Sequence, residues 1–289
     1  MRFQSVDDVQ AALRTESYLP DRGLATSIYL ALAMRRPLLL EGEAGVGKTE
    51  VAKTLTRILG AELVRLQCYE GIDASQALYE WDYARQLLYA RAIQDGTLSV
   101  DARVHELYGD EFLLERPLLK AIKLGGKAVL LVDELDRADD EFEAFLLEVL
   151  AEFTVTIPEL GTIHCDDPPA VIITSNRTRE LHDALKRRCL YHWIDYPDVD
   201  RETEIIQIRV PDAGPALARS VAVTVSKLRD LDLIKRPGAA EAIDWARALA
   251  LLGAEEVDAE SAAETLGWVV KNHDDLRRVE PALPTIVHE

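Results

Sequence analysis

The segment GEAGVGKT, residues 42–49, constrains the fold of this chain more than any other stretch because it fits the pattern G-x-x-x-x-G-K-[ST]. It follows PLLL, residues 37–40, an apolar run that predicts a buried strand. It precedes VAKTLTRILG, residues 51–60, whose apolar residues recur at helical spacing. A glycine turn between a strand and a helix is the context in which this pattern cradles phosphates. An ordinary flexible turn is the competing interpretation.

The chemistry of the segment favours a nucleotide over a plain turn. Glycines let successive backbone N–H groups curl around phosphates, and the N-terminus of a helix adds a partial positive charge. Lys48 offers a mobile charge to the β- and γ-phosphates of ATP, and Thr49 offers a hydroxyl to Mg²⁺. The predicted nucleotide contacts are Gly42, Glu43, Ala44, Gly45, Val46, Gly47, Lys48, Thr49 and Glu50.

Four further apolar runs predict strands, and helical patterns lie between them. The runs are ELVRLQ at 62–67, AVLLV at 128–132, AVIIT at 170–174 and LYHWI at 190–194. Because strands that alternate with helices indicate a parallel sheet covered on both faces, we expect an α/β core of five parallel strands over residues 1–197. Strand runs then disappear, and helical patterns predict a helical domain over residues 198–289. These patterns lie at 201–210, 213–231, 238–253 and 259–271.

Two adjacent carboxylates, Asp133 and Glu134, end the third of the five runs in the sequence AVLLVDELDRADD. Taken alone, they could mark the point where a strand surfaces into water. Because the strands of a parallel sheet all end at the edge that carries the phosphate loop, Asp133 is instead expected to reach toward the Mg²⁺ held by Thr49. Glu134 points elsewhere and suits a base that deprotonates the attacking water, which favours hydrolysis over phosphoryl transfer to another substrate.

Other polar residues near these strand ends have more than one interpretation. Asn176 follows the strand AVIIT, where its amide could hold the same water against the γ-phosphate or could simply form a turn. Asp140 and Glu143 are spaced like the capping pair of a helix over residues 140–153. These later acids therefore call for no catalytic explanation.

Composition and charge argue against several functional classes. The chain has 289 residues, of which 48% are hydrophobic, enough for a large core and a smaller module. Its 33 basic and 51 acidic residues give a net charge of −18, which argues against DNA or RNA as the main partner. Three widely spaced cysteines signal neither a disulfide framework nor a zinc site. The N-terminus has no signal-peptide pattern and no stretch suits a membrane span, so we expect a cytoplasmic protein.

Together these motifs resemble the AAA+ ATPases, with a Walker A motif at GEAGVGKT, a Walker B motif at VLLVDE, a sensor-1 asparagine at TSN and a helical lid. Two insertions, near residues 71–110 and at 153–163, are similar to those of the MoxR branch, and the second reads as a β-hairpin. More narrowly, RLQCYEG, YEWDYARQ, LLEVLAEFTVTIPELGTI and SNRTRELHDALKRRCLYHW resemble the CoxD-type ATPases associated with carbon monoxide dehydrogenase maturation.

The resemblance implies roles for residues and partners. It implies ATP and Mg²⁺ as ligands, Glu134 as the catalytic base and Asn176 as sensor 1. Family members form hexameric rings in which an arginine of the neighbouring subunit completes the site, and DALKRRC offers Arg187 and Arg188, of which Arg188 is preferred. Arg236 is the candidate for sensor 2, although it precedes Pro237 where the family has the reverse order. A von Willebrand factor A-type partner and a client metalloenzyme, a molybdenum–copper carbon monoxide dehydrogenase, are implied as well.

Alternatives remain open at this point. A nucleic acid motor or loader would share the fold, a non-hydrolysing nucleotide switch would share the binding loop, and a kinase would leave Asn176 and the arginine pair without a role. Tyr18 and Leu19 resemble an adenine-side contact or ordinary packing. Trp81 and Tyr83, in the first insertion, could face a channel or a client, or pack in a core.

Overall fold

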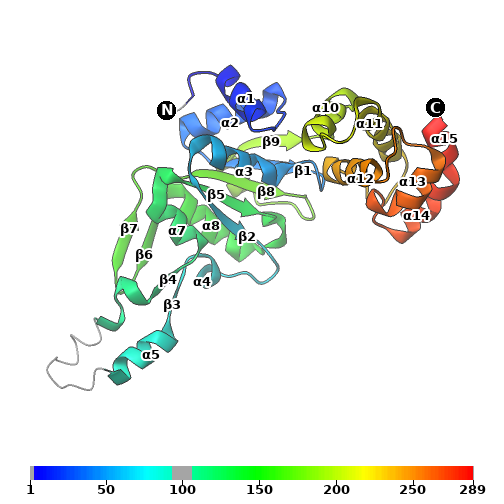
Figure 1. Ribbon diagram of the computed structural model, residues 1–289. Coiled ribbons are helices and arrows are strands. Elements are labelled where there is room, and N and C mark those ends of the chain that lie inside the picture. The colour runs from blue at the N-terminus through cyan, green and yellow to red at the C-terminus, as the bar shows by residue number, and fades with distance from the viewer. Residues whose placement is uncertain (1–2, 93–105, 289) are drawn as a thin grey trace. The chain divides into compact units, whose positions relative to one another are not determined.

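A computed structural model describes residues 3–92 and 106–288 of the chain, and the five predicted strands form one sheet (Figure 1). The strand order is β2-β5-β8-β1-β9. The bounds are β1 Leu38–Gly42, β2 Glu62–Gln67, β5 Ala128–Asp133, β8 Ala170–Ser175 and β9 Leu190–Ile194. The α/β class and the five-stranded parallel sheet between helices are thereby confirmed.

The register of this sheet fixes which strand ends meet. β2 pairs with β5, β5 with β8, and β8 with β1, all in parallel. Gln67 stands opposite Asp133, and Glu41 stands opposite Ser175. The carboxyl ends of β1, β2, β5 and β8 therefore lie along one edge, and the glycine-rich segment follows directly from β1 at that edge.

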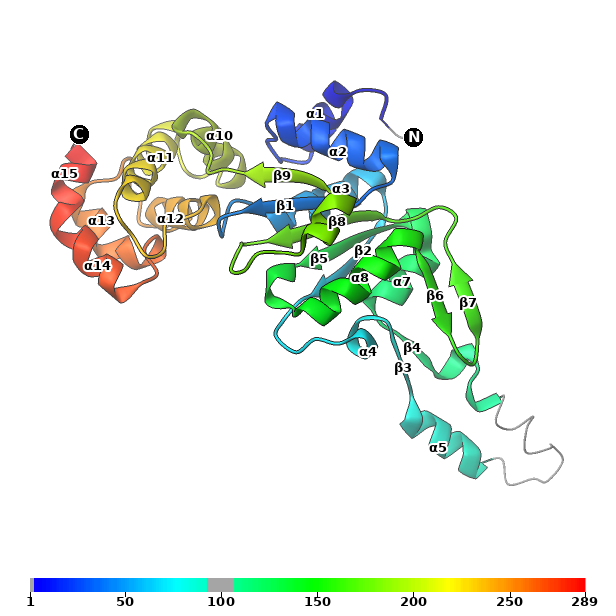
Figure 2. The same cartoon turned by 180° about the vertical axis from the view of Figure 1, so that it is seen from behind.

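Helices cover both faces of the sheet (Figures 1 and 2). α7 and α8 pack on one face, where their apolar side chains form a single core with β2, β5 and β8; α2 and α3 lie along the other face. The helices that precede β9 are α1 Val6–Thr15, α2 Arg22–Met34, α3 Lys48–Leu59, α4 Ala74–Ala77, α5 Tyr83–Ala92, α7 Pro117–Leu124, α8 Asp140–Glu152 and α9 Asp183–Arg188. The described residues contain no helix with the length and apolar character needed to cross a bilayer.

Both predicted insertions contain paired strands. β3 Tyr79–Trp81 pairs antiparallel with β4 Leu113–Glu115, and residues 93–105 of that insertion lie outside the described residues. β6 Thr154–Ile157 and β7 Gly161–His164 form an antiparallel pair, which confirms the hairpin at 153–163. Trp81 is buried in an apolar cluster with Phe112 and meets Tyr108 edge to face, whereas Tyr83 is exposed. Packing in a core therefore accounts for Trp81.

The predicted capping pair of α8 is wrong. The N-cap is Asp139, whose carboxylate accepts a hydrogen bond from the backbone N–H of Phe142, so the helix starts one residue earlier than a cap at Asp140 requires. Glu143 is buried and accepts hydrogen bonds from Arg179 and from the backbone N–H of His182. Glu143 thus anchors the segment after β8, a long-range role that spacing along the chain does not reveal.

The chain separates into two compact units. The first contains residues 1–6, 26–41 and 52–192, and the second contains residues 7–25, 42–51 and 193–289. Helices after β9 are α10 Val199–Arg209, α11 Pro215–Asp230, α12 Ala239–Leu251, α13 Ala259–Thr265, α14 His273–Val279 and α15 Leu283–His288. The four predicted helical patterns are confirmed, and α14 and α15 form where the sequence is weakly patterned. The proposed division at residue 197 stays a prediction.

A buried ion pair ties the helices of the second unit together. The guanidinium of Arg229, on α11, donates to both carboxylate oxygens of Glu202, on α10, at 2.8 and 2.6 Å. The same guanidinium donates through Nε to the carbonyl of Pro237 and lies over the ring of Tyr196. Burial raises the pKa of Glu202 above its ordinary value even with these hydrogen bonds. Arg229 therefore joins α10 and α11 to the segment that enters α12.

Replacing Arg229 with alanine is expected to lower the free energy of unfolding by about 3–5 kcal/mol, because it strands a buried carboxylate without its partner. Denaturant unfolding followed by circular dichroism measures this loss. The matched control is Arg247→Ala, which removes an arginine from the Arg247–Asp244 pair on α12, where both side chains are 55% exposed. The control is expected to cost less than about 1 kcal/mol. Equal losses for the two variants would contradict the account.

Candidate functional site

The glycine-rich segment has the backbone of a phosphate-binding loop. Gly45 and Gly47 have φ values of 76° and 95°, a backbone region that residues other than glycine rarely adopt. A Cβ on Gly45 would also come within 2.6 Å of a carboxylate oxygen of Glu241. Lys48 opens α3 and is 7% exposed, and its ammonium donates to the carbonyls of Gly42 and Glu43 at 2.7 and 2.6 Å. The loop therefore curls around its own lysine.

A cavity of about 210 Å³ adjoins this loop within the second unit. Its walls combine loop residues with polar and apolar side chains of four other segments: Ser17, Tyr18, Leu19, Gly45, Val46, Gly47, Glu50, Ile194, Asp195, Pro197, Arg201, Ile205, Arg209, Ala239, Ala240 and Ile243. Burial raises the pKa of Tyr18 above its ordinary value, and the phenol stays neutral. Arg201 fixes the turn by donating to the carbonyl of Leu19 at 2.6 Å. A cavity with many apolar residues in its walls, beside backbone N–H donors, has the composition typical of small-ligand sites.

The first turn of α12 is joined to the loop. The backbone N–H of Ala240 donates to the carbonyl of Gly45 at 3.1 Å. Glu241 caps α12 by accepting from the backbone N–H of Gly238 at 3.0 Å. Arg236, the sensor-2 candidate, is exposed and lies two residues before this cap. Burial raises the pKa of Tyr196, and the positive charge of Arg236 opposes part of that rise.

Asp133 is a buried carboxylate at the end of β5, in the first unit. It is 3% exposed. Its Oδ1 accepts from the hydroxyl of Thr174, on β8, at 2.6 Å. Its Oδ2 accepts from both Nε and a terminal nitrogen of Arg65, on β2, at 3.0 and 2.6 Å. The charge is thus paired, as buried carboxylates require, by residues of the two neighbouring strands.

Glu134 leaves the line of β5 because its backbone is left-handed, with φ 55° and ψ 49°. Strained backbone of this kind concentrates at functional sites. The backbone N–H of Glu134 donates to the Thr174 hydroxyl at 2.9 Å. Its Oε2 accepts from the side-chain amide of Gln67 at 3.1 Å and pairs with Arg137 at 3.0 Å. Its Oε1 makes no hydrogen bond within the part of the chain that the structure describes.

Asn176 lies just past the end of β8, on the same sheet edge. Its backbone N–H donates to the buried carboxylate of Asp136 at 3.2 Å, and Asp136 also accepts from the backbone N–H of Thr178 at 2.9 Å. The Asn176 side chain makes no hydrogen bond among the residues described. Asp136 therefore fixes the backbone and leaves the amide available, as a sensor requires.

The two candidate arginines at the end of α9 have different environments. The guanidinium of Arg188 donates to the carbonyl of Leu147, on α8, at 3.1 Å. The Arg187 side chain is exposed and makes no hydrogen bond or ion pair with the residues that the structure describes. Arg36 donates to the carbonyls of Arg187 and Arg188 at 2.7 and 3.0 Å and thereby caps the C-terminus of α9.

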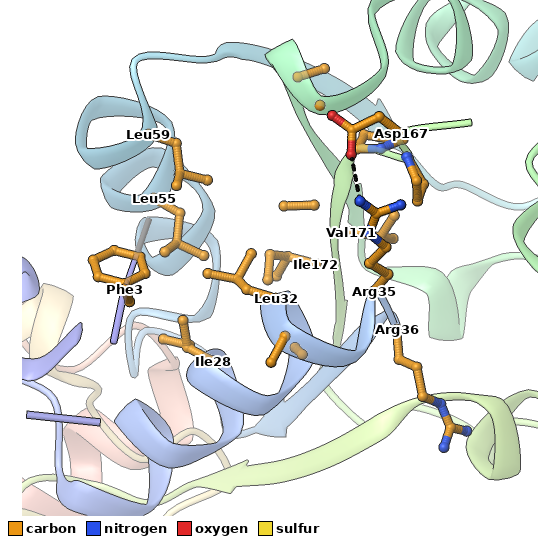
Figure 3. Close-up of a pocket in the computed structure, with 17 residues that line it drawn as sticks. Phe3, Ile28, Leu32, Arg35, Arg36, Leu55, Leu59, Asp167, Val171 and Ile172 are labelled. Atoms are coloured by element: carbon orange, nitrogen blue, oxygen red, sulfur yellow. Dashed lines mark ion pairs between the residues drawn. The ribbon is translucent and has the colours of Figure 1, made fainter. Parts of the chain in front are cut away.

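A second cavity, of about 460 Å³, lies at the opposite edge of the sheet, where β5 and β8 begin (Figure 3). Apolar side chains of α2 and α3 point into it toward Ile172, and an Arg35–Asp167 ion pair of 3.1 Å closes one side. Arg36 turns away from it, toward α9. None of the predicted site residues lines this cavity.

The structure brings together three of the predicted residues in the first unit, Asp133, Glu134 and Asn176, and it gathers the loop and Arg236 in the second. Glu43 and Ala44 are exposed, Val46 is buried, and Glu50 pairs with Arg209 at 3.7 Å. Sequence reasoning missed the residues that hold the carboxylates, namely Arg65, Gln67, Thr174 and Asp136. The sequence did contain one signal for Arg65 and Gln67. They are polar residues at the end of a predicted strand, as Asp133 and Thr174 are, and the polar ends of parallel strands meet at one edge of the sheet.

Comparisons with known proteins agree with this geometry. Residues 37–189, more than half of the chain, match the family described as AAA domain (dynein-related subfamily). An uncharacterized protein of Staphylococcus saprophyticus is 26% identical over 183 residues, which cover 61% of this chain and 62% of that protein. One of Staphylococcus epidermidis is 24% identical over 208 residues, which cover 70% and 65%. The match spans less than two thirds of either relative.

Among solved structures, a mutant of RuvB from Thermotoga maritima superposes with a TM-score of 0.51 at 18% sequence identity. The superposition covers 95% of this chain and 73% of that chain. At this identity the likeness concerns the fold alone. It agrees with the parallel sheet and the helical C-terminal region described above.

Proposed function

Because the chain belongs to the family of AAA domains, in the dynein-related subfamily, we propose that it binds ATP with Mg²⁺ and hydrolyses it. The observation that carries this proposal is the loop of residues 42–49, whose positive-φ glycines and buried lysine are suited to a triphosphate. The adjoining apolar cavity is suited to the base. Lys48 and Thr49 are the proposed contacts of the phosphates and the metal.

The residues present fit Mg²⁺ in particular. No group of three or more histidine, cysteine or acidic side chains gathers as a metal site in residues 3–92 and 106–288. Mg²⁺ needs no such cage, because it keeps several waters and binds one or two protein oxygens together with substrate phosphates. The carboxylate of Asp133 and the hydroxyl of Thr49 are oxygen donors of this kind. A bound Mg²⁺ ion would neutralise charge on the phosphates.

Glu134 is the proposed base. One of its oxygens is anchored by Gln67 and Arg137, and the other is left to accept a proton from water. Asn176 is proposed to orient that water through its uncommitted amide. Arg187, rather than the initially preferred Arg188, is proposed as the arginine that acts on a neighbouring subunit, since Arg188 already donates to Leu147. Arg236 remains the candidate for sensor 2.

The wider role is that of an ATP-driven remodelling chaperone of the MoxR branch, acting in the cytoplasm as a ring, by proposal a hexamer. The CoxD-like motifs support a client metalloenzyme, by proposal a molybdenum–copper carbon monoxide dehydrogenase, and a von Willebrand factor A-type partner. The hairpin at 153–163 supports the same branch. The acidic balance, with a net charge of −18, supports a protein client over a nucleic acid.

Titration of the full chain with ATP and Mg²⁺ in a calorimeter tests the proposal, with Lys48→Ala as the decisive variant. The wild type is expected to bind, and Lys48→Ala is expected to weaken binding roughly 10- to 100-fold, because a charge-assisted hydrogen bond to phosphate is lost. Lys53→Ala, on the exposed face of the same helix, is the control and should bind like the wild type.

Two outcomes would contradict the proposal. The first is an absence of binding heat with the wild type, and the second is equal affinity in the wild type and Lys48→Ala. Addition of duplex or single-stranded DNA to a steady-state ATPase assay distinguishes the proposed chaperone from a nucleic acid motor. Salt-sensitive stimulation by DNA would favour a nucleic acid client, whereas an unchanged rate is expected here.

A further inference from the structure

Arg65 joins the two carboxylates of the candidate site through a continuous chain of hydrogen bonds. Its guanidinium donates to Oδ2 of Asp133 at 2.6 and 3.0 Å, and it also donates to the side-chain oxygen of Gln67 at 2.5 Å. The amide nitrogen of Gln67 then donates to Oε2 of Glu134 at 3.1 Å. One arginine on the edge strand β2 therefore contacts the proposed metal ligand directly and the proposed base through one residue.

The direction of these hydrogen bonds is fixed by chemistry. An arginine has only donors and a carboxylate has only acceptors. The amide of Gln67, which lies between Arg65 and Glu134, must turn its oxygen toward the arginine and its nitrogen toward the glutamate. The Glu134 carboxylate and the carbonyl of Cys68, to which the amide nitrogen also donates at 3.4 Å, favour the same orientation of the amide. Arg65 adds the hydrogen bond that holds the amide oxygen, and it thereby helps to fix Gln67 against Glu134.

The charge of Arg65 bears on the metal. Asp133 has two oxygens, of which Oδ1 already accepts from Thr174 and Oδ2 accepts from Arg65. A divalent cation that binds Asp133 meets a carboxylate whose negative charge is already balanced by a guanidinium. At the few ångströms involved, two cations that share one carboxylate repel each other by an amount that matters for binding. Since the Arg65 side chain is 51% exposed, it has room to move aside.

We propose that Arg65 is a positioning residue of the ATPase site that competes with the metal for Asp133 and holds Gln67 in the orientation that fixes Glu134. The inference rests on the proposed function, because it takes Asp133 as a metal contact. Arg65 lowers the affinity for the free ion. In return it keeps the metal carboxylate and the base in a fixed relation.

The test measures metal affinity directly. Mn²⁺ is titrated into the full chain with saturating ADP, and free Mn²⁺ is followed by electron paramagnetic resonance. Arg65→Gln is expected to bind Mn²⁺ about tenfold more tightly than the wild type, because the competing charge is gone. Arg65→Lys keeps a positive charge but loses the forked N–H donors of the guanidinium. Its Mn²⁺ affinity is expected to lie between those of the wild type and Arg65→Gln. Arg65→Lys also serves as the second variant if Arg65→Gln folds poorly.

A matched control removes a cation that contacts the same strand, β2, at its opposite end, away from the site. Lys120, on α7, pairs with Glu62 at the start of β2 at 2.5 Å, and Lys120→Gln should leave the Mn²⁺ affinity unchanged. Steady-state kinetics supply a second readout. Arg65→Gln is expected to lower kcat with little change in KM for Mg·ATP, since the base loses its fixed position while the phosphate loop is untouched.

Unchanged or weaker Mn²⁺ binding by Arg65→Gln, with a wild type that binds ADP and Mn²⁺ normally, overturns this inference and leaves the proposed function standing. An equal gain in the Lys120→Gln control overturns it too, since the effect would then be general electrostatics. A wild type that binds no ADP overturns both the proposed function and the inference. The two failures are therefore distinguishable in one experiment.

Discussion

Glu134→Gln is expected to slow ATP hydrolysis roughly 10²- to 10⁴-fold while leaving ATP binding close to that of the wild type. The reason is that the amide keeps the size of the side chain but cannot accept a proton from water. Gln67 and Arg137 contact only one oxygen of Glu134, so the substitution changes the second position, which the described residues leave without a hydrogen bond. Phosphate release under saturating Mg·ATP measures the rate, and calorimetry measures binding.

A matched control for this variant is Glu141→Gln, which removes the same charge from the exposed first turn of α8. Its rate should equal that of the wild type. A Glu134→Gln protein that turns over at the wild-type rate would remove Glu134 from the role of base. Tight ATP binding combined with lost turnover would also separate a motor from a non-hydrolysing switch, because a switch has no turnover to lose.

Arg187→Ala is expected to lower the ATPase rate of the assembled protein roughly 10³- to 10⁵-fold, equivalent to about 4–7 kcal/mol of transition-state stabilisation. An arginine supplied by a neighbour stabilises charge that develops on the phosphates, and Arg187 offers an exposed guanidinium without partners in the described residues. Arg188→Ala should have a much smaller effect on rate. Its cost should fall on stability, because it removes the hydrogen bond to Leu147.

Mixing two inactive variants tests whether Arg187 acts across subunits. Glu134→Gln subunits carry an intact Arg187, and Arg187→Ala subunits carry an intact Glu134. Some sites in a mixed assembly therefore contain both residues, and activity should return on mixing. If mixtures stay as inactive as either variant alone, Arg187 does not complete a neighbour's site. If Arg188→Ala proves to be the inactive variant, and it regains activity on mixing with Glu134→Gln, the role would move to Arg188.

The strands were predictable because their signal is local. All five predicted segments became strands of the sheet, and in β1, β5 and β8 the signal is a short, mostly apolar run that is buried almost throughout. The capping of α8 was not predictable in the same way. Asp139 and Asp140 are adjacent acids with equal capping ability, and Glu143 was drawn away from the cap by Arg179, a residue 36 positions later. An ion pair between residues far apart in the sequence therefore took Glu143 out of the cap of α8.

The same distinction between local and long-range signals applies to the candidate site. The glycine-rich turn between β1 and α3 was predictable because its signal lies in consecutive residues, and Asp133 and Glu134 are adjacent in the sequence. Arg65 and Gln67 were missed because their meaning depends on β2 lying next to β5, an adjacency that the order of strands along the chain does not give. Thr174, likewise, bridges Asp133 and Glu134 only because β8 lies on the other side of β5.

The hydrogen bond from Ala240 to Gly45 joins the C-terminal helices directly to the glycine-rich loop. A carbonyl in the middle of this loop and the first turn of α12 cannot be displaced independently while that bond lasts. If ATP binds in the loop as proposed, arrival or loss of its γ-phosphate would be transmitted to α12 through main-chain atoms, and through the packing of Trp245 to the helices beyond it. The helices of the second unit would then move together with the loop.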